Sequence, residues 1–222
     1  MKVFITSATT GEWMPSFLEM DELYISKSKV FKVYFHQSGV GMLSSAVSLT
    51  QLCLEEKPSL VIQLGIAGCF DKTIPLKTVF IIHNEMLADI GVEEENKWKD
   101  IFDLKLEKSS YFPFEKRKLT NQHLKEFNLL KLKEVNAVTV NQISTSKKRI
   151  EQIKSKYAPL LESMEGAALH YTCKKFQIPF IQIRTVSNYV GERDKSKWEL
   201  KEAIEVLNKT AIAYIELLYK QK

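Results

Sequence analysis

The chain has 222 residues, of which 45 % are hydrophobic and 27 % charged, the ordinary balance of a soluble globular protein. This length can bury a sufficient core without disulfides or a metal, so we expect one domain over residues 1–222. The formal net charge is +5. Basic runs at 116–118 and 146–149 alternate with acidic and apolar residues, which favours a solvated surface over a nucleic-acid patch.

Targeting signals and metal-ligand patterns are missing from the sequence. The apolar stretch at 3–5 is too short for a signal peptide, and no apolar run approaches the roughly 18 residues of a membrane span. Cys53, Cys69 and Cys173 are widely spaced in apolar surroundings, as in a reduced cytoplasmic protein. The four histidines have no ligand spacing. We therefore expect a cytoplasmic protein with no membrane association, no metal and no cofactor.

The first half of the chain alternates apolar strands with polar turns and a helix. We expect a helix that opens after Ser38-Gly39-Val40-Gly41 and ends before Pro58, and a polar turn that leads to Glu12. Gly65-Ile66-Ala67-Gly68 is interpreted as a turn that closes a buried strand. The strands are expected at 3–5, 30–36, 60–64 and 79–82.

The second half begins with residues 91–118, whose weak periodicity indicates an excursion from the sheet and a candidate loop over a site. Ser146 is a predicted N-cap. Further strands are expected at 137–140 and 180–186, and helices at 146–157, 165–176 and 198–218, the last of them amphipathic. This order predicts an α/β fold with a central mixed or mostly parallel sheet between helices.

Polar side chains follow two of the expected strands. Met164-Glu165 lies at a helix start, and Ser187-Asn188 ends a later strand. Strand ends at one sheet edge build small-molecule sites in α/β folds, and a carboxylate can accept hydrogen bonds from two sugar hydroxyls. Each residue also has a local explanation: Glu12 and Glu165 suit helix starts, and Asn188 suits a turn.

Two glycine turns, at 38–41 and 65–68, permit close approach of the backbone to a ligand. Their spacing is not that of a dinucleotide fingerprint. Neither turn is followed by a Lys-Ser/Thr pair, which excludes a P-loop.

Together these segments resemble the nucleoside phosphorylase and nucleosidase superfamily, and within it the methylthioadenosine/adenosylhomocysteine nucleosidases. The resemblance rests on residues 8–12, 38–41, 65–68, 163–167 and 184–188, in order. It implies a three-layer α/β sandwich around a mixed sheet, a nucleoside substrate, and a homodimer or higher homo-oligomer. Two other segments look like futalosine hydrolases, which act in menaquinone biosynthesis: 87–93 and 188–198, the latter with the pattern N-x-V-G-x-R-D-x-S-x-W.

The resemblance also implies residue roles. Glu165 is expected to hold the ribose hydroxyls, and Glu12 to activate the attacking water. Asn188 stands where the nucleosidases carry Asp; its amide suits the 6-oxo group of hypoxanthine better than adenine, and Ser187 is expected to hold it. The remaining expected substrate contacts are Met164, Ala67, Gly68, Asn141, Ile143 and Arg193.

The expected reaction is hydrolysis of futalosine to hypoxanthine and dehypoxanthine futalosine. Gln63 stands where bacterial phosphorylases carry a phosphate-binding Arg, which favours water as acceptor. Alternatives are a methylthioadenosine, adenosylhomocysteine or aminodeoxyfutalosine nucleosidase, an inosine-type phosphorylase, and a silent nucleoside-binding protein. Arg193 is a candidate for the 5′ benzoate or for a surface ion pair. Phe17, Phe70 and Tyr189 are candidates for aromatic walls or for core packing.

Overall fold

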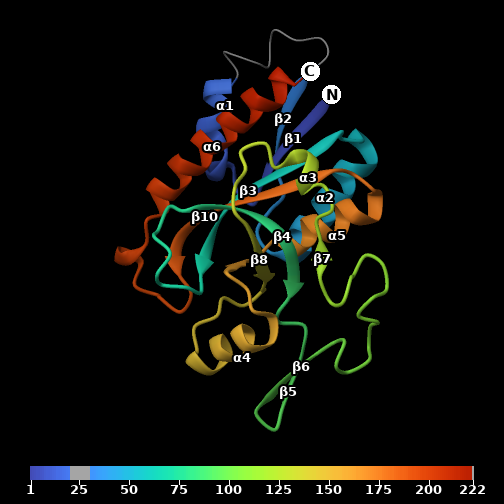
Figure 1. The fold of residues 1–222 in the computed structure, drawn as a ribbon, viewed down its shortest axis with the longest axis vertical. Helices are drawn as coiled ribbons and strands as arrows, with labels where there is room; N and C mark the ends of the chain where they lie inside the picture. The colour runs from blue at the N-terminus through green and yellow to red at the C-terminus, as the bar shows by residue number, and fades with distance from the viewer. Residues whose placement is uncertain (21–30, 222) are drawn as a thin grey trace.

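The structure, a computed structural model, describes residues 1–20 and 31–221, and a mixed sheet lies between layers of helices (Figure 1). The strands are β1 (Lys2–Ser7), β2 (Lys32–Gln37), β3 (Leu60–Cys69), β4 (Val79–Leu87), β5 (Gly91–Glu94), β6 (Lys97–Asp100), β7 (Leu119–Thr120), β8 (Glu134–Thr139), β9 (Leu161–Ser163) and β10 (Phe180–Tyr189). The helices are α1 (Met14–Met20), α2 (Met42–Glu56), α3 (Leu124–Phe127), α4 (Lys147–Tyr157), α5 (Gly166–Phe176) and α6 (Leu200–Lys220), with short 3-10 turns η1 (Thr10–Glu12) and η3 (Lys195–Lys197).

The main sheet has the strand order β10-β4-β8-β9-β3-β1-β2, with β7 paired to β4. Strand β10 also pairs with β3, so the strands from β10 to β3 close on themselves. The β1–β2, β1–β3, β3–β10, β4–β8 and β8–β9 pairs are parallel, whereas β4–β10, β3–β9 and β4–β7 are antiparallel. The predicted mixed α/β sheet is therefore confirmed, and its closure brings the ends of β3, β9 and β10 together.

Helices α1 and α6 cover one side of the sheet, and α2 and α5 cover the other (Figure 1). The α6 side buries Ala203, Leu207, Ala211, Ile215 and Leu218, which recur at helical spacing along one face. Burial of each Leu or Ile side chain contributes about 1.5–3 kcal/mol, so this helix is held by its apolar stripe. The three-layer prediction is thus confirmed.

Several predicted boundaries differ from the structure. Strand β3 continues through residues 65–68, and β10 continues to Tyr189, because the two strands pair along this whole stretch. The predicted turn at 65–68 and the predicted strand end at 186 are therefore wrong. Trp198 precedes α6 instead of belonging to it. Ser146 caps α4 as expected, and its side chain accepts from the Arg149 amide. Val30, the first residue of one predicted strand, lies outside the described residues.

Residues 91–118 form the β5–β6 hairpin and a turn-rich segment, placed at the lower end of the view in Figure 1. The buried Asp100 organises the segment: it accepts from the Phe102 amide, from Tyr157 and from Arg117. Lys156 adds a second cation to Asp100. The expected excursion from the sheet is confirmed. Its charged and aromatic side chains pack the segment against α4 and α5.

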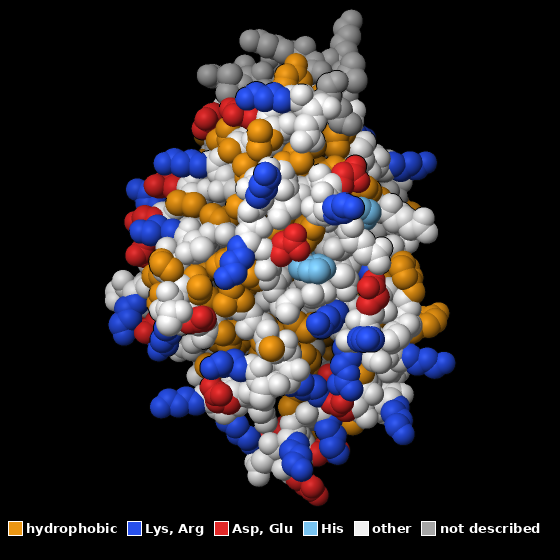
Figure 2. Space-filling view, in the orientation of Figure 1, with side chains coloured by type: hydrophobic (Ala, Val, Ile, Leu, Met, Phe, Trp, Pro, Cys, Tyr) orange, Lys and Arg blue, Asp and Glu red, His pale blue; other side chains and the backbone are white. Residues whose placement is uncertain are grey.

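The surface carries Lys and Arg side chains over the whole visible face, with Asp and Glu among them (Figure 2). The three cysteines are buried and free, as the sequence predicts. Among the described residues, no helix has the length and apolar character needed to cross a membrane. The same residues contain no group of three or more His, Cys, Asp or Glu side chains arranged for a metal ion.

Candidate active site

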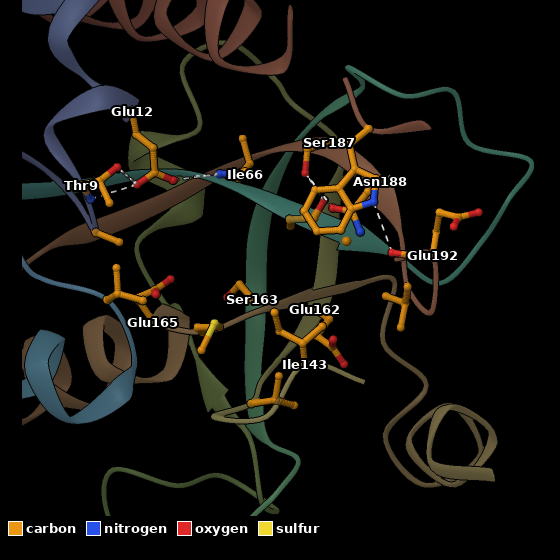
Figure 3. A pocket seen from close by; sticks show the side chains of 18 of the residues that line it. Thr9, Glu12, Ile66, Ile143, Glu162, Ser163, Glu165, Ser187, Asn188 and Glu192 are labelled. Carbon is orange, nitrogen blue, oxygen red and sulfur yellow. Dashed lines mark hydrogen bonds between the residues drawn. The ribbon is translucent and has the colours of Figure 1, made fainter. Parts of the chain in front are cut away.

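A cavity of about 320 Å³ opens where β1, β3, β9 and β10 end, a size suited to a small molecule (Figure 3). Its two ends differ in chemistry. Glu12 and Glu165 lie at one end, called the acid end here, and Ser187 and Asn188 lie at the other, called the amide end. Of the residues predicted for the site, the structure brings these onto the cavity: Glu12, Ala67, Gly68, Ile143, Met164, Glu165, Ser187 and Asn188.

Glu12 is held in the short turn after β1. The backbone amide of Thr9 donates to its Oε2 at 3.1 Å, and the Ile66 amide lies 3.4 Å from its Oε1. From α6, Asn208 donates to the Glu12 carbonyl at 3.0 Å. Burial raises the pKa of the Glu12 carboxyl, and the charge of Arg184 offsets part of this rise. The carboxyl is therefore fixed in place and suited to accept a proton.

Glu165 is the N-cap residue of α5. Its Oε1 accepts from the backbone amide of Gly41 at 3.0 Å, which ties the 38–41 loop to the start of α5. This contact brings Val40 onto the cavity wall. The predicted glycine turn thus meets the predicted carboxylate, although they are separated by 124 residues in the chain.

Arg184, on β10, was not predicted as a site residue. It is 2 % exposed, donates to Gln63 Oε1 at 2.8 Å and lies 4.0 Å from Glu165 Oε2. Its guanidinium crosses directly over Gly65, where a Cβ would lie 1.8 Å from Nη1 and 3.4 Å from Glu12 Oε1. Gly65 is therefore required for close approach: it lets one buried cation lie between two carboxylates.

Asn188 owes its position to a β-bulge. Val186 pairs with Ala67 and Asn188 with Gly68, so Ser187 is the extra residue on β10. Bulges of this kind redirect side chains beside functional sites. Ser187 Oγ donates to Asn188 Oδ1 at 2.9 Å, and Asn188 Nδ2 donates to the Tyr189 carbonyl at 3.1 Å. One N–H of the amide and one lone pair of Oδ1 are left to face a ligand.

Glu162, on β9, is a cavity residue that the sequence reasoning missed. It is 6 % exposed, and its Oε1 accepts from the Ser144 amide at 3.0 Å. Its Oε2 and the Ser144 hydroxyl are both buried and make no other hydrogen bond, and the Ser144 side chain lies close enough to act on the carboxyl. Burial raises the pKa of this carboxyl, while the Ser144 hydrogen bonds lower it.

A second buried network lies beneath the start of α5. Glu85 on β4 accepts from Gln182 at 2.8 Å and from Thr139 at 3.0 Å, and Thr139 in turn accepts from the Ala167 amide at 2.7 Å. Burial raises the pKa of Glu85 to about 7. Burial also lowers the pKa of His170 to about 3, and its Nδ1 lies 2.7 Å from a backbone carbonyl. These groups support the helix end that carries Glu165.

Other predicted contacts lie off the cavity. Asn141 is exposed and bonds to Asp89, and Arg193 stacks on Trp198 with its Cζ 5.3 Å from the ring centroid. Trp198 itself lines the cavity. Three aromatic residues proposed as walls pack elsewhere: Phe17 on Trp13 and Phe35, Tyr189 in the sheet core, and Phe70 in a neighbouring cleft. Among the described residues, none from 91–118 lines the cavity, so the expected loop over the site is wrong for this structure.

That neighbouring cleft is larger, about 970 Å³, and adjoins the cavity along residues 190–192. Its polar side chains are exposed lysines and acids on α4 and the 71–73 turn. It lacks the buried, fixed carboxylates of the smaller cavity, which is therefore the candidate active site.

Comparison with known proteins gives the family. The sequence profile of the phosphorylase superfamily matches residues 12–219. The chain belongs to this superfamily. Its similar relatives include a 5'-methylthioadenosine/S-adenosylhomocysteine nucleosidase of Bacillus subtilis, 26 % identical over 85 % of this chain and 80 % of that protein. They also include the futalosine hydrolase of Thermus thermophilus, 26 % identical over 77 % of this chain and 76 % of that one.

Solved structures of the superfamily share the fold. The futalosine hydrolase of Helicobacter pylori superposes with a TM-score of 0.78 at 17 % identity, covering 100 % of this chain and 98 % of that one. The methylthioadenosine/adenosylhomocysteine nucleosidase of the same species gives 0.76 at 17 % identity, covering 97 % and 98 %. The α/β nucleoside phosphorylase-like architecture is thus established for this member of the superfamily, while the two kinds of relative differ in the nucleoside that their names state.

Proposed function

We propose that this protein hydrolyses the N-glycosidic bond of futalosine and releases hypoxanthine and dehypoxanthine futalosine. The observation that carries the proposal is the amide of Asn188, fixed at the amide end of the cavity by Ser187. The similarity to the futalosine hydrolase of Thermus thermophilus supports the same reading.

The base is read by donor and acceptor geometry. Because the Tyr189 carbonyl can only accept, its hydrogen bond fixes Nδ2 of Asn188 as the donor, and Oδ1 then lies 2.9 Å from Ser187 Oγ. The free N–H suits the 6-oxo group of hypoxanthine, and the second lone pair of Oδ1 can accept from N7–H as the base departs. A 6-amino group would face that N–H donor to donor, and such a mismatch in a buried site discriminates strongly.

The sugar and the water are assigned to the acid end. Glu165 accepts hydrogen bonds from the ribose 2′- and 3′-hydroxyls, and Met164 packs on the sugar. Glu12 takes a proton from the water whose oxygen attacks C1′. The C1′–N9 bond breaks and its electron pair passes to the purine, which takes a proton from solvent at N7 and leaves as neutral hypoxanthine, while Glu12 returns its proton to solvent. A positioned base of this kind contributes about 10²–10⁴-fold.

Water is favoured over phosphate by the charges around Arg184. Its guanidinium is engaged by Gln63 and lies near Glu165, and its charge also acts on Glu12. A phosphate dianion at this end would approach two buried carboxylates, whose repulsion is strong in a low-dielectric site. A neutral water meets no such barrier.

An adenine-type nucleosidase is the second candidate, because relatives such as the Bacillus subtilis protein carry that name. It would place the base differently, so that the free lone pair of Asn188 Oδ1 accepts from the 6-amino group and the free N–H donates to N7.

The two readings are separated by supplying futalosine, aminodeoxyfutalosine, methylthioadenosine and inosine, each with and without phosphate, and by following free base by chromatography. We expect phosphate-independent release of hypoxanthine from futalosine. Release of adenine from the 6-amino substrates without turnover of futalosine would overturn the proposal, and phosphate-dependent turnover would assign a phosphorylase.

A homodimer or higher homo-oligomer is also proposed. Leu43 and Val47 on α2 are 80 % and 64 % exposed and follow Val40, which is 59 % exposed and lines the cavity. A second copy packed on this face would cover apolar surface and narrow the cavity mouth. Light scattering should give at least twice the chain mass of 25.6 kDa, and Leu43→Glu should reduce it. A monomeric wild type would contradict this.

A further inference from the structure

Asn208 is a buried polar side chain on the apolar face of α6. It is 2 % exposed, and its neighbours along this face, Leu207 and Ala211, belong to the hydrophobic core. Asn is a poor helix former, and burial of an amide is costly unless its groups are hydrogen-bonded. A polar residue at this position therefore indicates a contact that an apolar side chain could not make.

The Asn208 amide uses both of its N–H groups and both lone pairs of its oxygen. Nδ2 donates to the carbonyls of Glu12 at 3.0 Å and Ile204 at 2.7 Å. Oδ1 accepts from the backbone amide of Ser16 at 2.8 Å and from the Ser16 hydroxyl. Because a carbonyl can only accept and a backbone amide can only donate, these contacts fix the orientation of the side chain. Asn208 thus ties Glu12 and Ser16 to α6.

Glu12 and Ser16 are four residues apart, the spacing of the hydrogen bond that defines an α-helix. In a continuous helix the Ser16 amide would donate to the Glu12 carbonyl. Here the amide donates to Asn208 and the carbonyl accepts from Asn208, and η1 gives way to α1 at Trp13, between the two residues. A side chain inserted between helical hydrogen-bond partners is a recognised cause of such a break.

This break decides where the Glu12 carboxyl lies. Glu12 is the last residue of η1, and its carboxyl reaches the backbone amides of Thr9 at 3.1 Å and Ile66 at 3.4 Å (Figure 3). If the turn rewound into α1, the backbone of Glu12 would rotate. The carboxyl would then move away from the Ile66 amide and out of its buried position beside the cavity.

We infer that Asn208 is a positioning residue for Glu12: by replacing one helical hydrogen bond, it keeps η1 separate from α1 and holds the Glu12 carboxyl at the acid end. The inference rests on the proposed function for the role of Glu12 in activating water. It does not depend on which purine is released.

The decisive variant is Asn208→Leu, which is close to Asn in shape and extends the apolar face of α6. We expect kcat to fall about 10- to 100-fold, the scale of a catalytic group displaced by about 1 Å. Hypoxanthine should bind within about twofold of wild type, because the amide end is unchanged. Added to Glu12→Gln, the same substitution should alter kcat by less than about twofold, since no proton acceptor remains to be displaced.

Tyr214→Phe is the matched control. Tyr214 is buried on the same helix and donates to the Phe127 carbonyl at 2.9 Å, away from Glu12. Its loss should lower the free energy of unfolding and leave kcat unchanged in both backgrounds. An equal fold-loss from Asn208→Leu with and without Glu12→Gln overturns the inference, because a purely structural role has that result. If Asn208→Leu does not fold, Asn208→Ala, with the highest helix propensity, replaces it in the cycle.

Failure of the proposed function has a different signature. The cycle uses whichever nucleoside the wild type hydrolyses, so absence of futalosine turnover contradicts the assigned substrate and not the role of Asn208. A crystal structure of Asn208→Leu needs no turnover. It should show the Ser16 amide bonded to the Glu12 carbonyl, and Glu12 Oε1 beyond hydrogen-bond distance of the Ile66 amide. A Glu12 carboxyl in its wild-type position overturns the inference.

Discussion

The acid end and the amide end of the cavity differ in how completely their polar groups are satisfied. At the acid end, Glu12 and Glu165 receive backbone N–H groups and share the buried charge of Arg184. At the amide end, Asn188 keeps one unused N–H and one unused lone pair on Oδ1. The carboxylates of the acid end are therefore preorganised before any ligand binds. The polar groups of the amide end are fully hydrogen-bonded only when a ligand is present.

This difference assigns separate tasks to the two ends. A preorganised, charge-balanced group can perform the same step on any nucleoside whose sugar fits. Unpaired buried groups penalise every ligand that does not match them, so they set specificity. We therefore expect substitutions at the acid end to change the rate and those at the amide end to change the choice of base.

Glu12→Gln should have the largest effect. Gln cannot accept the proton of the attacking water, so kcat for futalosine should fall about 10²–10⁴-fold while hypoxanthine binds within twofold of wild type. Because burial raises the pKa of Glu12 above its ordinary value of 4.5, wild-type kcat should decline on acidification at a pH above 4.5, and this limb should vanish in the variant. Stopped assays across pH and calorimetry measure these quantities. Undiminished turnover would remove the base assignment.

Asn188→Asp should change preference more than rate. A carboxylate presents no donor to the 6-oxo group, so the ratio of kcat/KM for futalosine over aminodeoxyfutalosine should fall by at least about 100-fold. Ser187→Ala, which removes only the hydroxyl that orients the amide, is the milder companion and should reduce the ratio less. A ratio that both variants leave intact would mean that the amide end does not read the purine 6-position.

Glu85→Gln tests the support beneath the acid end through stability. The folded protein binds more protons at Glu85 between pH 4.5 and about 7, so this carboxyl weakens folding as pH rises through that window. His170, with its pKa lowered from 6.5 to about 3, acts in the opposite direction and weakens folding as pH falls through that range. Between pH 4.5 and 6.5 the two slopes oppose each other.

Glu85→Gln removes the pH dependence of the free energy of unfolding that is due to Glu85 and leaves that of His170. Its free energy of unfolding, relative to wild type, should rise by about 1.4 kcal/mol per pH unit between pH 4.5 and 7. Urea unfolding at several pH values measures this. Parallel pH profiles for the two proteins would show that Glu85 is not protonated in the folded state over this range.

Arg193→Ala should have the smallest effect. Because the guanidinium stacks on Trp198 at the cavity wall, its loss should raise KM about two- to fivefold, equally for futalosine and inosine. A rise above tenfold confined to futalosine would instead make Arg193 a partner of the 5′ carboxylate. Arg193→Lys, which retains the charge, separates the loss of stacking from the loss of charge.

Residues at the ends of strands could be predicted from the sequence, because apolar runs that stop at polar residues are local signals. Glu165, Ser187 and Asn188 were placed at the sheet edge in this way, and the structure brings them to one cavity. The predicted boundaries at 65–68 and 186 are wrong because pairing of β3 with β10, a contact between distant segments, extends both strands.

Buried charges within strands were harder to interpret. Arg184, Glu85 and Glu162 each lie inside or beside an apolar run, where a charge has no place unless it is paired. A charged residue within an apolar run was therefore the one local signal that these side chains have buried partners. Their partners, however, lie on distant segments, Gln63 on β3 for Arg184, Gln182 on β10 for Glu85 and the 140–146 loop for Glu162, so these networks are not visible before the fold is known.

The central claim is tested most directly by a crystal structure with hypoxanthine bound. We expect the base to lie over Gly68, with Asn188 within hydrogen-bond distance of O6 and N7. A base bound away from Asn188, or one whose 6-position faces another residue, would contradict it.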